Sequence, residues 1–225
     1  MPPSRRWPTR GVVTPDQFIS VIEDNGLIIP IGEWVLREAC AQAKLLQDEG
    51  VEPVKVSINL SVQQFRDPHL LTLVKNILDE TGLDAKWLEL EITESMLVDN
   101  VNEVIRKLHE LKSLGLSLAI DDFGTGYSSL SYLKSLPIDI VKVDRSFVCD
   151  IPNDQNDVEI TAAVIAMAHK LKFKVVAEGV ETEKQKIFLN NNGCDYAQGY
   201  FFSQPLDKQH LRITLERGIL ARATQ

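Results

Sequence analysis

The sequence has few of the residues that mark secreted, membrane-spanning or nucleic-acid-binding proteins. Only three of its 225 residues are cysteines, and Cys40, Cys149 and Cys194 fit neither a disulfide framework nor the spacing of a zinc site. We therefore expect reduced thiols in a cytoplasmic protein. Lysine and arginine number 24 against 32 aspartates and glutamates, a net charge of −8. This charge argues against a nucleic-acid polymer as partner, because the phosphate backbone requires a basic face.

Long apolar runs are also absent. The longest, around residues 162–168, is too short to span a bilayer. No apolar segment follows the basic start at Arg5 and Arg6, as it would in a signal peptide. We expect no membrane segment in this chain. What the sequence does contain is 44% hydrophobic and 25% charged residues, which is the composition of a globular domain with a full core.

From residue 54 onward an apolar strand, a polar tip and an amphipathic helix recur. The expected strands are Val54–Leu60, Trp87–Thr93, Leu116–Asp121, Ile138–Val143, Phe173–Glu178 and Tyr196–Gly199. The helices that follow them are expected near 67–81, 100–114, 127–135, 155–171, 182–192 and 207–217. Such alternation predicts parallel strands joined by crossover helices.

The first fifty residues are expected to be organised differently. Residues 1–13 are rich in proline and arginine and are expected to be loose. Thr14-Pro15 is a helix start, with threonine as the cap and proline at the first helical position, and this helix ends at Asn25. A second helix is expected from about Gly32 to Asp48. We treat residues 14–220 as a single barrel domain.

Every expected strand ends in polar, mostly ionisable residues. In chain order these are Asn59; Glu91 and Glu94; Asp121 and Asp122; Lys142 and Asp144; Glu178 and Glu181; and Gln198. In a (β/α)8 barrel the strand ends meet at one mouth, where such enzymes have their sites. In an open doubly wound sheet the outer strands are too far apart to share a site. The pattern therefore favours a barrel, although each residue alone is also typical of a surface charge or a helix cap.

Two adjacent carboxylates, Asp121 and Asp122, end the third strand. They repel each other unless a cation or a shared proton lies between them, and hard divalent ions such as Mg2+, Mn2+ or Ca2+ favour such oxygen ligands. The alternative is an Asx turn that caps the next helix. The four histidines fall in expected helices, away from the strand ends, and are interpreted as surface residues.

Six segments in this order resemble the EAL domain family, bacterial phosphodiesterases specific for cyclic di-GMP. They are Ser57–Ser61, Glu89–Glu94, Asp121–Leu130, Val141–Asp144, Ala177–Glu181 and Ala197–Pro205. The resemblance runs from Gly11 to about Leu215. It implies a modified (β/α)8 TIM-type barrel whose first strand is antiparallel to the others. It also implies a homodimeric signalling domain with cyclic di-GMP as its partner.

The resemblance further implies a site with two Mg2+ or Mn2+ ions. Asn59, Glu91 and Asp121 are similar to ligands of the first ion, while Asp121, Asp122 and Glu178 are similar to residues that hold or adjoin the second. Two such ions clamp a phosphodiester and lower the pKa of a bridging water.

Other positions acquire roles through the same resemblance. Lys142 resembles the proposed general base, with a pKa expected to be lowered beside the ions, and Gln198 resembles the residue that orients the water. Glu94, with Thr93, is similar to residues that secure the loop 123–129 and couple dimerisation to metal binding. The substrate-binding positions are matched by Ser61, Asp144 and Glu181.

One departure from the family matters. Its Glu-Ala-Leu motif should lie just before the segment similar to residues 8–11, and residues 1–7 contain no glutamate. We expect an incomplete barrel without the first two strands and one metal-ligating carboxylate, and hence impaired or absent hydrolysis. Neither Arg5 nor Arg6 is assigned to the family's substrate-binding arginine. A hydrolase, a degenerate module that binds cyclic di-GMP or a protein, and a poorly folding remnant stay open.

Overall fold

The computed structural model describes residues 5–7, 11–13, 18–97, 101–126 and 130–216. Its centre is a six-stranded sheet in the order β3-β4-β5-β6-β7-β8, in which all neighbouring strands are parallel. The strands are β3 (Val56–Asn59), β4 (Leu88–Thr93), β5 (Ser117–Phe123), β6 (Ile140–Val143), β7 (Lys174–Ala177) and β8 (Tyr196–Ala197). The expected strands are confirmed, each within two residues at either end.

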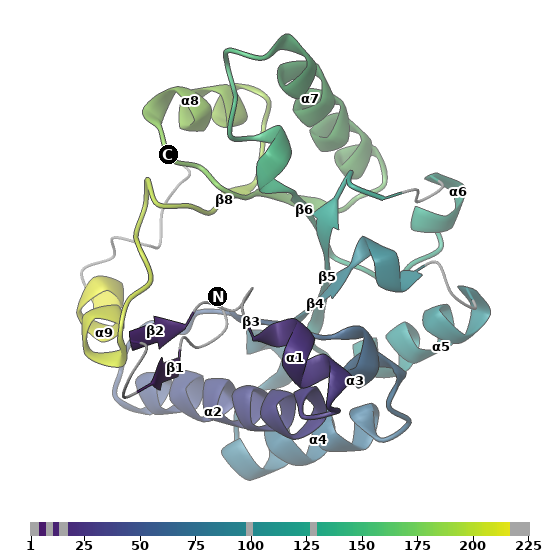
Figure 1. Cartoon of the computed structure of the whole chain (residues 1–225), viewed down its shortest axis with the longest axis vertical. Coiled ribbons are helices and arrows are strands. Elements are labelled where there is room, and N and C mark those ends of the chain that lie inside the picture. Colours follow the sequence, from purple (N-terminus) through teal and green to yellow (C-terminus); the bar gives the residue numbers. More distant parts are fainter. Residues whose placement is uncertain (1–4, 8–10, 14–17, 98–100, 127–129, 217–225) are drawn as a thin grey trace.

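The sheet curls into a half-barrel with helices on its outer face (Figure 1). These helices are α4 (Leu70–Thr81), α5 (Val101–Lys112), α6 (Leu130–Leu133), α7 (Gln155–Lys170) and α8 (Glu183–Asn191). Residues 127–129, where the helix before Leu130 was expected to start, lie outside the described residues. The parallel, helix-covered architecture confirms the predicted TIM-barrel-like fold class.

Strand β4 shows why one face of the sheet is apolar and the other carries chemistry. Leu88, Leu90 and Ile92 are fully buried. Because successive side chains in a strand point to opposite faces, the intervening Glu89 and Glu91 lie on the concave face. The apolar face packs the strand against the helices, and the polar face is left to line the interior of the half-barrel.

The N-terminal part differs from expectation in two places. Helix α2 (Ile28–Asp48) begins four residues before the expected Gly32. Pro30 is compatible with this start, since a proline in the first helical turn removes an N–H that has no helical partner. Two short strands, β1 (Arg5–Trp7) and β2 (Gly11–Val13), pair antiparallel within the segment expected to be loose.

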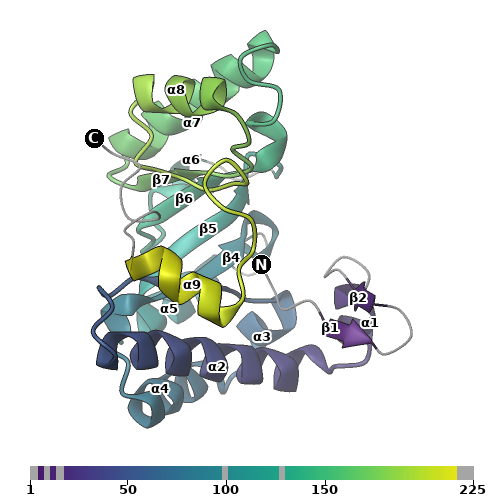
Figure 2. The same cartoon turned by 90° about the vertical axis from the view of Figure 1, so that its left-hand side faces the viewer.

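Helix α1 (Ile19–Asp24) has Phe18 at its N-cap, and the expected start at Thr14 lies outside the described residues. At the other end of the chain, α9 (Lys208–Glu216) lies against α2 (Figure 2). Arg212 Nη1 is 2.7 Å from Glu49 Oε2, and Lys208 pairs with Glu38. Among the helices that the structure describes, none has the length and apolar character that crossing a bilayer requires.

Two aspartate side chains make the same kind of hydrogen bond at the starts of two strands. Asp139 Oδ2 accepts the backbone N–H of Leu118 at 2.9 Å, and its Oδ1 accepts from Lys112 Nζ at 2.6 Å. In the same way, Asp195 Oδ2 accepts the N–H of Val175 at 2.9 Å and lies 2.8 Å from His169 Nε2. Each aspartate precedes one strand and accepts a hydrogen bond from the amide of the second residue of the neighbouring strand. The four histidines are exposed, as the sequence predicted.

We predict that Asp139→Ala lowers the free energy of unfolding by about 2–3 kcal/mol, because it leaves the buried Leu118 N–H without an acceptor. Urea denaturation measures this difference. Asp48→Ala is the matched control, since Asp48 forms only an exposed ion pair with Lys44 in α2 and should change stability by less than about 0.5 kcal/mol. Equal effects of the two substitutions would contradict the prediction.

Candidate active site

Four side chains from four consecutive strand ends meet at one mouth of the half-barrel. Lys142 Nζ lies 2.6 Å from Glu178 Oε1, 2.8 Å from Glu91 Oε2 and 3.1 Å from Asp121 Oδ1. Lys142, Glu91 and Asp121 are buried, and Glu178 is half-buried. We call these four residues the mouth cluster. The arrangement shows that the carboxyl ends of β4, β5, β6 and β7 deliver their polar residues to a single place.

A β-bulge brings the two adjacent aspartates to this place. Ile120 pairs with Val141 and Phe123 pairs with Val143, so Asp121 and Asp122 together oppose the single residue Lys142. Asp122 has a φ of +55°, which a non-glycine residue adopts only when its surroundings require it. The bulge breaks the alternation of the strand, which would otherwise send Asp121 and Asp122 to opposite faces.

The electrostatics of the mouth cluster follow from burial and close opposite charge. Burial lowers the pKa of Lys142, but attraction to Glu91, Glu178 and Asp121 outweighs burial and holds this pKa above its ordinary value. Burial raises the pKa of Glu91 and of Glu178, and Lys142 opposes the rise. Partial burial also raises the pKa of Asp122, with further contributions from Asp121 and Asp144. The protein's own charges therefore favour the protonated form of Lys142, and the lowered pKa expected for Lys142 beside two metal ions stays a prediction.

The donor set suits a hard divalent cation. Three carboxylates share one ammonium group, so the mouth cluster carries an excess of negative charge when all its groups are ionised, and Asp122 adds to it. Within the described ranges no three His, Cys, Asp or Glu side chains already surround a common point as metal ligands. The Lys142 ammonium lies within 3.1 Å of an oxygen of each of the three carboxylates. Their oxygens are the ligand type that Mg2+ and Mn2+ prefer.

Asp122 contacts the cluster, since its backbone N–H donates to Asp121 Oδ1 at 3.1 Å, and other predicted site residues lie at neighbouring strand ends. Asn59 is exposed and pairs in register with Glu91. Gln198 is exposed, and its backbone N–H donates to Ala177 O at 2.8 Å. Thr93 Oγ1 lies 2.9 Å from Ser95 Oγ. These positions at neighbouring strand ends are compatible with roles in binding, which stay predictions.

Two of the predicted substrate-binding residues act as helix caps. Ser61 Oγ accepts the N–H of Gln64 at 3.2 Å, and this capping box starts α3 (Val62–Arg66), a helix that the sequence reading did not separate from α4. Asp144 Oδ1 accepts the N–H of Ser146 at 2.9 Å and starts the 3-10 helix η4 (Arg145–Phe147). Each hydroxyl or carboxylate is thus already engaged locally.

Glu94 holds the loop that follows the two aspartates. It lies at the start of the 3-10 helix η3 (Glu94–Leu97) and is buried. Its Oε2 accepts the backbone N–H groups of Gly124 at 3.0 Å and Gly126 at 3.2 Å. Glycine is required at both positions, because a Cβ at Gly126 would lie 2.9 Å from Glu94 Cδ and one at Gly124, where φ is +101°, would lie 2.8 Å from the Phe147 ring.

We predict that Glu94→Gln accelerates amide hydrogen exchange at residues 124–126 by about 10- to 100-fold, because the charge-assisted bonds to the two glycine N–H groups are weakened by about 1–3 kcal/mol. Hydrogen–deuterium exchange followed by mass spectrometry measures this. Glu110→Gln, which removes only an exposed pair with Arg106, serves as the control. Unchanged exchange in Glu94→Gln would show that the loop is held by other contacts.

Sequence reasoning missed a second layer of residues at the mouth. Arg145 Nη2 donates to Glu181 Oε1 at 2.8 Å. Gln185 Oε1 accepts the backbone N–H of Glu181 at 2.8 Å, while Gln185 Nε2 donates to Val148 O and Cys149 O. The signal for Gln185 was present in the sequence, since Thr182 followed three residues later by glutamine is a capping box. Arg145 had no such signal.

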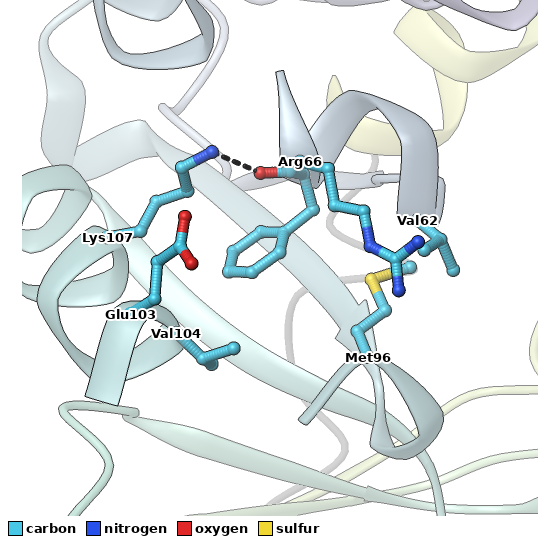
Figure 3. A pocket seen from close by; sticks show the side chains of 7 residues that line it. Val62, Arg66, Met96, Glu103, Val104 and Lys107 are labelled. Atoms are coloured by element: carbon cyan, nitrogen blue, oxygen red, sulfur yellow. Dashed lines mark hydrogen bonds between the residues drawn. The ribbon is translucent and has the colours of Figure 1, made fainter. Parts of the chain in front are cut away.

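A separate cavity of about 390 Å3 lies between α3, η3 and α5 (Figure 3). Its lining consists of Val62, Phe65, Arg66, Met96, Glu103, Val104 and Lys107. Lys107 Nζ donates to Phe65 O at 2.6 Å and to Asp67 O at 2.9 Å, so this lysine serves to end α3. The cavity contains none of the residues that the sequence predicted for the site.

Comparison with known proteins gives matches along nearly the whole chain. The sequence pattern described as "EAL domain" matches residues 4–205. "Cyclic di-GMP phosphodiesterase NbdA" of Pseudomonas aeruginosa is 50% identical over 203 residues, 89% of this chain and 26% of that protein. "Cyclic di-GMP phosphodiesterase PdeR" of Escherichia coli is 38% identical over 203 residues, 89% of this chain and 31% of that protein. The chain thus spans about a quarter to a third of these curated relatives.

Solved structures match equally broadly. A structure of the PaMucR phosphodiesterase in complex with c-di-GMP superposes with a TM-score of 0.90 and 41% identity, covering 92% of this chain and 84% of that one. The FimX EAL domain from Pseudomonas aeruginosa bound to c-di-GMP gives a TM-score of 0.80 and 27% identity, covering 90% and 81%. The curled sheet and its helices are therefore shared with proteins of known structure.

Proposed function

The chain belongs to the EAL domain family, and on this premise we propose that it is a cyclic di-GMP phosphodiesterase domain of bacterial second-messenger signalling. The proposed reaction is the addition of water to one phosphodiester of cyclic di-GMP, which breaks one P–O bond and gives linear pGpG. The observation that carries the proposal is the mouth cluster, in which Glu91, Asp121 and Glu178 surround Lys142 within 3.1 Å. Relatives with this named activity support it.

The proposal assigns the metal-binding work to the acidic side of the mouth. Asn59, Glu91 and Asp121 would hold one Mg2+ or Mn2+ ion, and Asp121 with Asp122 a second, beside Glu178. Such ions supply charge stabilisation at the phosphoryl group and a water of lowered pKa. The Asp121–Asp122 bulge is the feature that makes two adjacent carboxylates available from one strand.

Lys142 and Gln198 would handle the proton and the water. Lys142 is surrounded by carboxylates that hold its proton, so its proposed role as a base requires positive charge at those carboxylates to release it. Gln198, at the end of β8, would orient the attacking water by hydrogen bonding. The proposed roles of both residues belong to one step, the activation of water beside the scissile phosphate.

The test is an assay of cyclic di-GMP hydrolysis with Mg2+ or Mn2+, with chromatographic detection of pGpG. Asp121→Asn is the informative variant, since it removes one negative charge at nearly constant volume. We expect the parent protein to form pGpG at an impaired rate and only in the presence of a divalent ion, and the variant to form at least about 100-fold less. Equal rates for parent and variant would contradict the site assignment.

A module that binds cyclic di-GMP or a protein without hydrolysis is the second candidate. One observation favours it, because the printed sequence contains no Glu-Ala-Leu segment. Calorimetric binding of cyclic di-GMP without formation of pGpG would support this candidate. Extension of the chain by a segment that contains Glu-Ala-Leu should then restore hydrolysis if only the carboxylate of its glutamate is limiting.

We also propose that the protein is a cytoplasmic homodimer that uses the region 123–135. Glu94 already anchors the first part of this region through Gly124 and Gly126. Sedimentation velocity should show a dimer, and a strict monomer at high protein concentration would argue against it.

A further inference from the structure

A row of polar side chains crosses three strands just below the proposed metal ligands. Ser57 on β3, Glu89 on β4 and Ser117 on β5 are register partners across the sheet. The next row toward the mouth contains Asn59 and Glu91, which pair two residues farther along β3 and β4. Because residues i and i+2 of a strand point to the same face, both rows line the concave face, about 7 Å apart.

One lysine and one glutamate join the members of this row. Lys55, which immediately precedes β3, donates from Nζ to Ser117 Oγ at 2.6 Å. The same Nζ lies 3.5 Å from Glu89 Oε2. From the other side, Ser57 Oγ donates to Glu89 Oε1 at 2.9 Å. We call these four residues the lower cluster. Its side chains link β3, β4 and β5 to one another independently of the backbone hydrogen bonds of the sheet.

Stability alone does not explain a charged pair at this place. The Glu89 side chain is 5% exposed and that of Lys55 is 37% exposed. Glu89 Oε2 has no hydrogen-bond partner among the described residues. The interior layers of barrels are mostly filled by branched apolar side chains, and replacement of a buried ion pair by apolar residues is often neutral or stabilising. A buried glutamate with incomplete compensation therefore indicates a role other than holding the core together.

The lower cluster lies on the three strands that carry the proposed ligands of the first ion. Asn59, Glu91 and Asp121 each follow the member of the lower cluster on their own strand by two or four residues. Strand β3 is at the edge of the six-stranded sheet, with β4 as its neighbour. The bond from Lys55 to Ser117 passes across β4, so it fixes the distance of the edge strand from β5 as well.

We propose that Lys55 and Glu89 are positioning residues for the first metal ion, an inference that rests on the proposed function. They hold β3, β4 and β5 at the spacing that lets Asn59, Glu91 and Asp121 reach one ion. They touch neither the ion nor the nucleotide and act only through the strands. Residues that support metal ligands from behind commonly contribute about 10- to 100-fold to metal affinity. Metal affinity and fold stability should therefore respond differently when the lower cluster is changed.

The test compares Mn2+ affinity with stability in the full chain. Electron paramagnetic resonance follows Mn2+ binding, because the signal of the free ion disappears when the ion is bound, and urea denaturation without metal measures stability. The decisive variant is the double substitution Lys55→Met with Glu89→Leu, which replaces the ion pair by apolar side chains. We expect its Mn2+ affinity to fall about 10- to 100-fold, with an unfolding midpoint equal to or above that of the parent.

Two further variants separate positioning from a general loss of charge. Lys55→Arg keeps a cationic donor for Ser117 and Glu89, so its Mn2+ affinity should stay within about threefold of the parent. Lys44→Met is the matched control, because the Lys44 side chain is 33% exposed and pairs with Asp48 within α2. This control should leave Mn2+ affinity unchanged, and a loss equal to that of the double variant would contradict the inference.

A Mn2+ affinity of the double variant within about twofold of the parent would overturn the inference. So would an unfolding midpoint that falls together with the affinity, because a weakened fold then accounts for the loss. A parent that binds no Mn2+ would overturn both this inference and the proposed metal site. A parent that binds Mn2+ but forms no pGpG, with weaker Mn2+ binding in the double variant, would overturn the proposed hydrolysis and leave the positioning role intact.

Discussion

Replacement of Lys142 by methionine is expected to lower the rate of cyclic di-GMP hydrolysis by about 10²- to 10⁴-fold. Lys142 is the common partner of Glu91, Asp121 and Glu178, so its removal takes away both the proposed proton acceptor and the group that gathers the carboxylates. Initial rates of pGpG formation at saturating Mn2+ measure the loss. A rate within tenfold of the parent would show that Lys142 does not take part in the reaction.

The same substitution should destabilise the fold, because it leaves buried carboxylates without their counter-ion. Removal of one partner of a buried ion pair commonly costs about 3–5 kcal/mol. Lys86→Met is the control, since Lys86 is exposed and pairs with exposed Asp84. Rates are therefore to be compared at a temperature where circular dichroism shows both proteins folded, so that lost activity is not confused with unfolding.

The second large effect is expected from Gly199→Ala. A Cβ at Gly199 would lie 2.1 Å from Val180 O and 2.4 Å from Val180 N, and a backbone segment cannot move aside as a side-chain tip does. This close contact lies where the segment after β8 passes the loop after β7. Two backbone hydrogen bonds join these segments, from Val180 N to Gln198 O at 3.0 Å and from Phe201 N to Val180 O at 3.0 Å. We expect a loss of about 3–5 kcal/mol in the free energy of unfolding.

Gly193→Ala provides the matched control for this prediction. Gly193 has a φ of +74°, and the nearest atom to its added Cβ, on His169, is 4.0 Å away. The control should cost only the 1–2 kcal/mol or so of a side chain in the left-handed region. Urea denaturation compares the free energies of unfolding of the two variants directly. Similar losses would show that the close approach of Gly199 to Val180 does not contribute to stability as proposed.

The sequence was sufficient for the sheet because each strand has an apolar core and an ionisable tip. Leu88, Leu90 and Ile92 mark the buried face of β4, and the intervening Glu91 is thereby assigned to the concave face. Parallel strands then bring all such tips to one edge. This reasoning placed Glu91, Asp121, Lys142 and Glu178 together, and the structure brings the other three within 3.1 Å of Lys142.

What the sequence did not reveal depends on contacts between distant segments. The β-bulge at Asp121 and Asp122 interrupts the alternation of side chains between the two faces of β5, and no local sequence pattern predicts it. The raised pKa of Lys142 follows from three carboxylates that come from three other strands, so the sequence alone did not predict how strongly the protein itself favours the protonated lysine. Arg145 was missed because its role depends on Gly179 and Glu181, which are 34 and 36 positions away in the sequence.

The central claim is that Glu91 and Asp121, at the ends of adjacent strands, form a divalent metal site for phosphodiester hydrolysis. Anomalous X-ray scattering from crystals soaked with Mn2+ and cyclic di-GMP tests this most directly. We predict an anomalous peak within about 2.0–2.6 Å of carboxylate oxygens of Asp121 and Glu91, with a nucleotide phosphate adjacent to it. A nucleotide bound elsewhere, with no peak at Asp121, would contradict the account.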